Sequence, residues 1–162
     1  MQQVDVETAF YRIDGPEVLS EYFRLPPVDL DALREVRPDL QLDHLPGRRA
    51  TPRLAVLAMG WSWSLFFCQR LVEQRVLDAG YPESALVRDR HHVGDMSDGT
   101  VCAVYVDGAA VVGSSRARVS HGILAVDTSL NSAGLKPKAS LTTRTSRCSL
   151  ASPSSASQAR SL

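Results

Sequence analysis

The sequence predicts an α+β fold in which helices cover one face of an antiparallel sheet. Three observations indicate this class: a strand pattern at the N-terminus, two long stretches with helical periodicity, and two apolar runs joined by Asp107-Gly108. With a short final strand, they give the order strand, helix, strand, strand, helix, strand. This is the βαββαβ arrangement of ferredoxin-like folds.

The N-terminal part begins with a strand over residues 2–7, where apolar and polar side chains alternate before a turn of helix. A short helix is expected after Pro16, because proline is favoured at the start of helices. Residues 25–53 contain five prolines and are predicted to form an irregular insertion with one short helix near residues 29–36.

The first long helix is predicted over residues 64–79. Its apolar positions start at Leu65 and recur at steps of three and four residues, which indicates one buried face. Gly80 follows the last of them and is suited to the C-terminal cap. Residues 82–100 are polar and are predicted to form a loop.

The central hairpin is predicted from two apolar, β-rich runs, residues 101–106 and 109–112, with the turn at Asp107-Gly108. A second helix with helical spacing is expected over residues 119–133. A short strand near residues 139–143 completes the predicted sheet.

The chain is predicted to form one domain, residues 1–143, followed by a tail, residues 144–162. The tail is rich in Ser, Ala and Arg and has no apolar periodicity, so we expect it to be disordered. The overall charge of zero conceals an asymmetry: residues 1–114 hold 11 basic and 17 acidic residues, and residues 115–162 hold 7 and 1. This permits a polyanionic partner, and it equally fits a solvated tail.

Several classes of protein are not indicated. The three cysteines are widely spaced, which argues against a disulfide framework or a zinc site and favours an intracellular location, cytoplasmic or nuclear. The N-terminus lacks the pattern of a signal peptide. The most apolar stretch, residues 54–68, is shorter than the roughly 20 residues that span a bilayer, so we expect no membrane contact.

Two carboxylates are expected to come together in the predicted sheet. Asp5 lies on the first strand and Asp107 at the tip of the hairpin, and these strands are neighbours in the βαββαβ arrangement. They repel each other unless a divalent cation such as Mg²⁺ lies between them, and a pair of such ions supports phosphoryl transfer. The alternative is that both are solvated residues, since Asp-Gly is a common hairpin turn.

Three segments, in this order, resemble the central palm motifs of retroelement (retrotransposon or retroviral) reverse transcriptases: VDVETAF, MGWSWSLFFCQ and VYVDGAAVVGS. The first has an Asp followed five residues later by an aromatic residue. The second has a Gly before a helix that carries Gln69. The third is similar to the Tyr-x-Asp-Asp hairpin of this family. A weaker match is Ala-Gly-Leu with two lysines behind it, and the resemblance spans roughly residues 3–138.

The resemblance implies a metal site for nucleotidyl transfer. Asp5 and Asp107 would bind Mg²⁺ or Mn²⁺, with the backbone carbonyl of Val6 as a further ligand. Lys138, or alternatively Lys136, would donate a proton to the leaving pyrophosphate.

The resemblance also implies contacts to substrates. Phe10 would exclude a 2′-hydroxyl of the incoming nucleotide, and Tyr105 would lie near the primer end. Met59, Gly60 and Trp61 would line the pocket for the templating base and the nucleotide. The alternative for Phe10 and Trp61 is ordinary packing.

The sequence departs from the family at important positions. Gly108 stands where the second hairpin aspartate is expected, Leu65 replaces a usual proline, and neither the fingers nor the thumb is recognisable. We therefore expect weak divalent binding and no primer extension by this chain.

The resemblance implies that this chain is a fragment of an RNA-directed DNA polymerase. Its partners would be an RNA template, a DNA primer, dNTPs and the rest of a retroelement polyprotein. The alternatives are a catalytically inactive retroelement remnant, or a small ferredoxin-like interaction domain. The sequence leaves open whether the chain is an enzyme.

Overall fold

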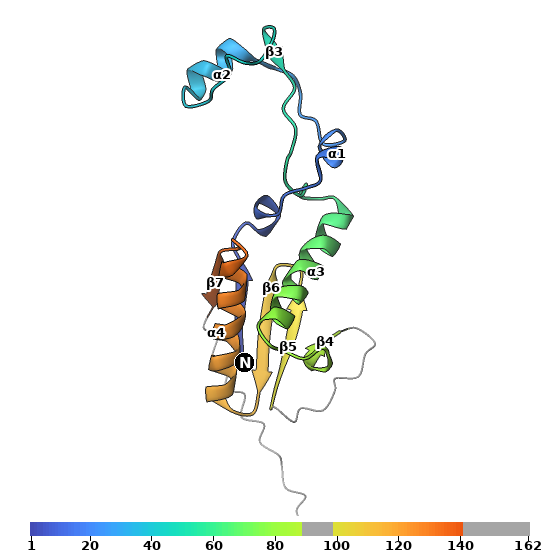
Figure 1. The fold of residues 1–162 in the computed structure, drawn as a ribbon, viewed down its shortest axis with the longest axis vertical. Helices are drawn as coiled ribbons and strands as arrows, with labels where there is room; N and C mark the ends of the chain where they lie inside the picture. The colour runs from blue at the N-terminus through green and yellow to red at the C-terminus, as the bar shows by residue number, and fades with distance from the viewer. Residues whose placement is uncertain (89–98, 141–162) are drawn as a thin grey trace, which may run out of the picture.

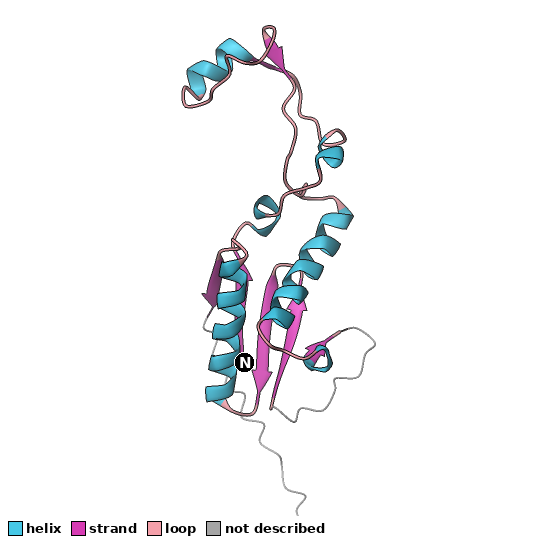
Figure 2. Cartoon of the chain, viewed as in Figure 1, coloured by secondary structure: helices cyan, strands magenta, loops and turns pink. Residues whose placement is uncertain are grey.

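The computed structural model describes residues 1–88 and 99–140 as a mixed α/β structure built on a five-stranded sheet (Figures 1 and 2). The strand order is β4-β5-β6-β1-β7, and only the edge strand β4 runs parallel to its neighbour. The strands are β1 (Gln2–Val6), β4 (Leu86–Val87), β5 (Thr100–Tyr105), β6 (Gly108–Gly113) and β7 (Pro137–Ser140).

Two long helices, α3 (Ser62–Asp78) and α4 (Arg116–Ser132), lie on the same face of this sheet (Figure 1). Each helix connects two strands that are separated by one other strand, α3 between β1 and β5 and α4 between β6 and β7. Gly80 and Gly134 follow the helix ends with φ of 95° and 76°, a left-handed conformation that glycine adopts without strain.

The core lies between the two helices and the covered face of the sheet. Alternate residues of β1, Val4 and Val6, are 1% and 2% exposed. The helices contribute residues spaced mainly by four or seven positions, which places them on one side of each helix: Cys68, Val72 and Val76, and Val119, Val126 and Leu130. Burial of each large apolar side chain stabilises the fold by about 1.5–3 kcal/mol. The helices therefore cover the face of the sheet that carries these side chains, and the opposite face stays open.

Between β1 and α3 the chain forms an arm that projects beyond the end of the sheet (Figure 1). Its two legs are joined by the bridges Asp14↔Val56 and Arg24↔Arg53. Its elements are η1 (Ala9–Arg12), α1 (Glu17–Ser20), β2 (Val28–Asp29), α2 (Leu30–Val36) and β3 (Arg49–Ala50).

The predicted combination of a sheet with two long helices is confirmed, but the sheet is mixed and not antiparallel throughout, because β4 pairs with β5 in parallel. Details of the hairpin and of α3 were also wrong. The turn expected at Asp107-Gly108 lies one residue earlier, because Gly108 pairs with Tyr105 as the first residue of β6. The buried face of α3 begins at Ser64 rather than at Leu65, which is 50% exposed. The buried Ser64 hydroxyl is satisfied by donating to the Ala58 carbonyl at 2.8 Å.

The predicted loop over residues 82–100 contains η2 (Glu83–Ala85) and β4. The last strand begins at Pro137, earlier than the sequence predicts. Residues 141–143 and the predicted tail, residues 144–162, lie outside the described part of the chain. Within the described part, no helix has both the length and the apolar character needed to cross a membrane.

Candidate functional site

The open face of the sheet carries several of the predicted site residues. Along β1, Asp5 is exposed between the buried Val4 and Val6, because side chains of a strand alternate between faces. Tyr105 at the end of β5 is 83% exposed, and Lys138 on β7 is exposed as well.

These residues form one row across four strands. Tyr105 pairs with Gly108, Gly108 pairs with Asp5, and Asp5 pairs with Lys138. Directly paired residues of antiparallel strands project to the same face, with Cβ atoms about 4.5–5.5 Å apart. The row therefore brings Asp5, Tyr105 and Lys138 together on the open face.

Asp107 lies in the two-residue turn between β5 and β6. Its backbone carbonyl accepts a hydrogen bond of 2.9 Å from the Val6 N–H, so the turn is attached to β1 one residue after Asp5. The preceding residue, Val106, has a φ of 52°. A β-branched residue rarely adopts this left-handed conformation, which costs about 1–3 kcal/mol.

Gln69 on α3 holds this strained turn. Its side-chain oxygen accepts from the Val106 N–H at 2.6 Å, and its side-chain amide donates to the Val104 carbonyl at 3.0 Å. Both bonds join α3 to the hairpin across a long sequence separation. The sequence singled out Gln69 only as part of a motif, and the structure makes it a positioning residue for the Asp107 turn.

Glu73, one turn further along α3, orients Gln69. The Gln69 amide donates to the Glu73 carboxylate at 2.9 Å, and Glu73 is only 8% exposed. The charge of Glu73 is balanced by Arg70 at 2.9 Å and Arg88 at 3.5 Å. A buried carboxylate requires such partners, so this group of residues has a defined arrangement.

Gly108 leaves room for the side chain of Asp5. A Cβ atom built on Gly108 would lie 2.7 Å from Oδ1 of Asp5, so the two cannot occupy these positions together. The Asp5 carboxylate thus fills the space that a side chain at position 108 requires. The Asp5 carboxylate lies at the end of a short, rotatable side chain on the open face, so it can rotate away from a side chain at position 108 at small energetic cost.

The negative charge of Asp107 acts on a thiol of α3. Burial raises the pKa of the Cys68 thiol on α3 to about 11, and the negative charge of Asp107 adds to this effect. Asp5 extends from the open face instead. The structure thus joins Asp5 and Asp107 through their backbones, while the Asp107 carboxylate lies within electrostatic reach of α3.

The donors at this tip do not form a strong metal site. No group of three or more His, Cys, Asp or Glu side chains able to hold a metal ion occurs among residues 1–88 and 99–140. The available donors are Asp5, Asp107 and the Val6 backbone, and Lys138 faces Asp5 across the strands. A lysine paired with Asp5 across the strands disfavours a further positive charge beside that carboxylate.

The remaining predicted residues lie elsewhere. Phe10 sits in η1 and packs against the core. Met59, Gly60 and Trp61 precede α3 at the base of the arm, and Gln69 lies eight residues after Trp61, about 12 Å along a helix. The structure does not bring these three residues into the row. Lys136 is exposed, and its carbonyl accepts from the Glu7 N–H at 2.9 Å.

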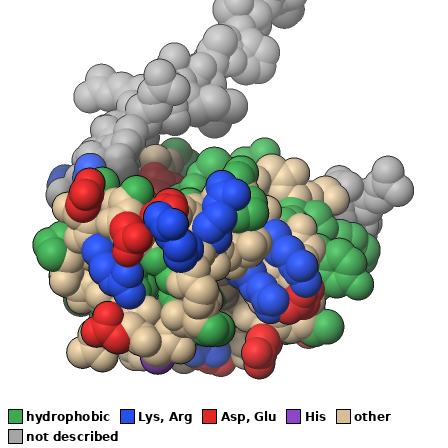
Figure 3. Space-filling model, turned by 90° about the horizontal axis from the view of Figure 1, so that it is seen from above, with side chains coloured by type: hydrophobic (Ala, Val, Ile, Leu, Met, Phe, Trp, Pro, Cys, Tyr) green, Lys and Arg blue, Asp and Glu red, His purple; other side chains and the backbone are tan. Residues whose placement is uncertain are grey.

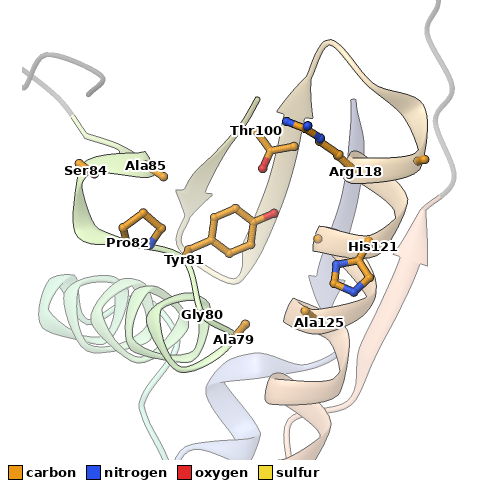
Figure 4. A pocket seen from close by; sticks show the side chains of 12 residues that line it. Ala79, Gly80, Tyr81, Pro82, Ser84, Ala85, Thr100, Arg118, His121 and Ala125 are labelled. Carbon is orange, nitrogen blue, oxygen red and sulfur yellow. The ribbon is translucent and has the colours of Figure 1, made fainter. Parts of the chain in front are cut away.

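A cavity of about 520 Å³ lies between the C-terminal end of α3 and the first turns of α4 (Figure 4). Its polar lining includes Tyr81, Thr100, Arg118 and His121. Thr100 begins β5 and Tyr105 ends it, so the cavity opens at the opposite end of the strand, about 16 Å from the hairpin tip. None of the predicted site residues lines it.

Comparisons with known proteins gave no match among family models, curated proteins or solved structures.

Proposed function

We propose that this chain is a reverse-transcriptase palm fragment. Such a palm transfers deoxynucleotides from dNTPs to a DNA primer on an RNA template, and this one has lost one carboxylate of the catalytic set. The observation that carries the proposal is the junction of Asp5 and the Asp107 turn, where the Val6 N–H donates to the Asp107 carbonyl at 2.9 Å. Two acidic residues that are far apart in sequence are thereby adjacent at the end of two neighbouring strands.

The strand order supports this proposal. Apart from the edge strand β4, the order is β7-β1-β6-β5, with both long helices on one face. Numbered along the chain, these strands follow the order 4-1-3-2, which is the order that the proposed ferredoxin-like palm requires. The resemblance to palm domains implies this arrangement.

The positions of the three motif segments also support it. The first segment forms β1, the second leads into α3, and the third forms the turn between β5 and β6. Gln69 of the second segment hydrogen-bonds to Val106 of the third, 37 residues later in the chain. Segments that resembled the palm motifs only by chance would not be expected to form such a hydrogen bond with one another.

The chemistry of the palm is not complete in this chain. Gly108 supplies no carboxylate, and Lys138 faces Asp5 with a positive charge. Divalent ions in polymerase sites stabilise charge on phosphate oxygens, and removal of members of such catalytic sets lowers rates by orders of magnitude. We therefore propose that the scaffold persists as an inactive remnant that binds Mg²⁺ or Mn²⁺ only weakly.

Restoring the missing carboxylate tests the proposal. We expect Gly108→Asp to bind Mn²⁺ at least about tenfold more tightly than wild type in a titration followed by electron paramagnetic resonance, since each added carboxylate ligand strengthens the site. A double Asp5→Asn, Asp107→Asn variant should lose this binding. Asp31→Asn, which removes an exposed carboxylate on α2, is the matched control and should leave the affinity unchanged. An unchanged affinity in Gly108→Asp would mean that the carboxylates do not converge.

Primer extension tests the inactive state separately. We expect wild type to add no detectable deoxynucleotide to a DNA primer on an RNA template with either Mg²⁺ or Mn²⁺. Robust incorporation that Asp107→Asn abolishes would contradict the view that Gly108 has removed the chemistry.

A small interaction domain is the second candidate function, favoured by one observation. Large aromatic side chains are exposed at the N-terminal end of α3, away from the row on the sheet. Contiguous exposed apolar surface of this kind marks sites of protein association.

A further inference from the structure

Most of the large aromatic residues of the chain lie together at the N-terminal end of α3. The sequence holds four Phe and two Trp residues, and all but Phe10 belong to this group. Their ring centroids are 5.4 to 6.3 Å apart from one ring to the next, within the range of favourable aromatic contacts. We call this group the aromatic cluster: Phe23, Trp61, Trp63, Phe66 and Phe67.

Three members of the aromatic cluster are exposed, and Phe23 and Trp61 are half-buried beside them. Trp63 is 56% exposed, Phe66 49% and Phe67 43%, and the adjoining Met59 and Leu65 are 65% and 50% exposed. An aromatic side chain offers about 150–250 Å² of surface, so the cluster and its neighbours present roughly 500 Å² of apolar area. A patch of roughly this size is as large as the largest apolar patch on a typical monomer, and such patches often have a binding role.

This end of α3 has apolar residues on two sides. One side, which includes Cys68 and Val72, is buried against the sheet. Trp63, Phe66 and Arg70 follow one another at steps of three and four residues, so they form a second stripe on the exposed side. A helix that is apolar on two sides is normally covered on both.

The charges around the aromatic cluster favour a polypeptide partner over a polyanion. Arg24 and Arg53 both form ion pairs with Glu21, and Arg70 pairs with Glu73. Seen from the arm end, basic and acidic side chains are interspersed and do not form a basic patch (Figure 3). Phosphate groups need unpaired positive charge, which these ion-paired arginines do not supply.

We infer that the aromatic cluster binds a second copy of this chain in a symmetric dimer. Two such patches bury roughly 1,000 Å² in total, which reaches the lower limit for a specific interface. The chain carries no net charge, so two copies do not repel each other. When two α3 helices cross antiparallel at Phe66, Arg70 of one copy lies over Trp63 of the other, which is a favourable cation–π arrangement.

Sedimentation equilibrium of the full chain across the micromolar range tests this inference. We expect a closed monomer–dimer equilibrium for wild type. A double Trp63→Gln, Phe66→Gln variant should shift the dissociation constant at least about tenfold, because buried aromatic residues dominate interface energies. Leu124→Gln is the matched control: Leu124 is 63% exposed but isolated on α4, and its replacement should leave the equilibrium unchanged.

A milder variant keeps the test decisive if the double variant fails to fold. Arg70→Ala leaves every aromatic ring in place and leaves Arg88 beside Glu73, and it should weaken the dimer by roughly five- to thirtyfold, because a symmetric dimer loses two exposed cation–π contacts. A wild-type chain that stays monomeric overturns the inference. A dimer that is insensitive to both variants, an open-ended series of larger species, or binding of single-stranded oligonucleotide at the aromatic cluster in place of dimerisation also overturns it.

Discussion

Replacing Gln69 with alanine removes the link between α3 and the turn that carries Asp107. The variant loses the bonds to the Val106 N–H and the Val104 carbonyl, and it loses the bond to Glu73. The turn then has to keep Val106 at a φ of 52° without support from the helix.

The expected loss follows from these contacts. Each of the two bonds to the hairpin contributes about 1 kcal/mol net, and a buried N–H group left without a partner costs about 1–3 kcal/mol. We therefore expect the free energy of unfolding of Gln69→Ala to fall by about 2–3 kcal/mol. Urea unfolding followed by circular dichroism measures this as a lower midpoint with an unchanged slope.

Gln74→Ala is the matched control, because Gln74 lies on the same helix and its amide donates to the exposed Asp78 at 2.9 Å. Its replacement should change stability by less than about 0.5 kcal/mol, as is usual for surface positions. If Gln69→Ala were as stable as this control, the Gln69 bonds would not hold the hairpin and the reasoning would fail.

Val106→Gly tests the strain directly. Glycine adopts a φ of 52° without steric cost, whereas alanine does not. Both Val106→Gly and Val106→Ala lose the packing of Val106 against the core, so we expect the glycine variant to be about 1 kcal/mol more stable than the alanine variant in the Gln69→Ala background. A glycine variant that is less stable than the alanine variant would contradict the strain at Val106.

Three further changes have definite expected outcomes. Gly122→Ala should destabilise the protein by about 1–3 kcal/mol in urea unfolding, although alanine normally favours a helix, because its Cβ would overlap the Tyr81 hydroxyl; a gain in stability would refute this contact. Burial raises the pKa of Cys68 from 9.0 to about 11 and that of Cys102 to about 12, so the thiols stay neutral in the folded state while unfolded thiols ionise above pH 9.0. These thiols should leave the free energy of unfolding unchanged just below that pH and lower it between pH 9 and about 11, as measured by urea titration. A double Cys68→Ala, Cys102→Ala variant should lose the part of the fall that begins near pH 9, while Tyr81, whose pKa is also raised by burial, contributes only above pH 10. Asp29→Ala should speed amide hydrogen exchange in α2 by the equivalent of about 1 kcal/mol, since Asp29 accepts hydrogen bonds from the first backbone N–H groups of that helix; unchanged exchange would mean that the cap is not needed.

Local patterns predicted the elements of this fold well. The steps of three and four residues that predicted the two long helices also identify most of their buried residues, such as Val72 and Leu130. Alternation in β1 correctly separated the buried Val4 from the exposed Asp5. Such patterns are readable because each depends only on residues within a few positions of one another.

The same patterns misjudged details that depend on distant contacts. Asp107-Gly108 has the composition of a hairpin turn, yet Gly108 is drawn into β6 because it pairs with both Tyr105 and Asp5. Leu65 fits the helical stripe by spacing, but Ser64, four residues before the buried Cys68, faces inward and donates to the Ala58 carbonyl. Pairing and packing therefore override the local preference in both places.

The sequence by itself determined the two long helices, the central hairpin, the first and last strands of the sheet, and the candidate site residues. Only the tertiary structure decided that Lys138 lies opposite Asp5, that Gln69 holds the Asp107 turn, and that the aromatic residues near α3 remain exposed. The physical reason is that strand register and the choice of covered face arise from contacts between residues far apart in the chain. Side-chain periodicity carries no record of those contacts.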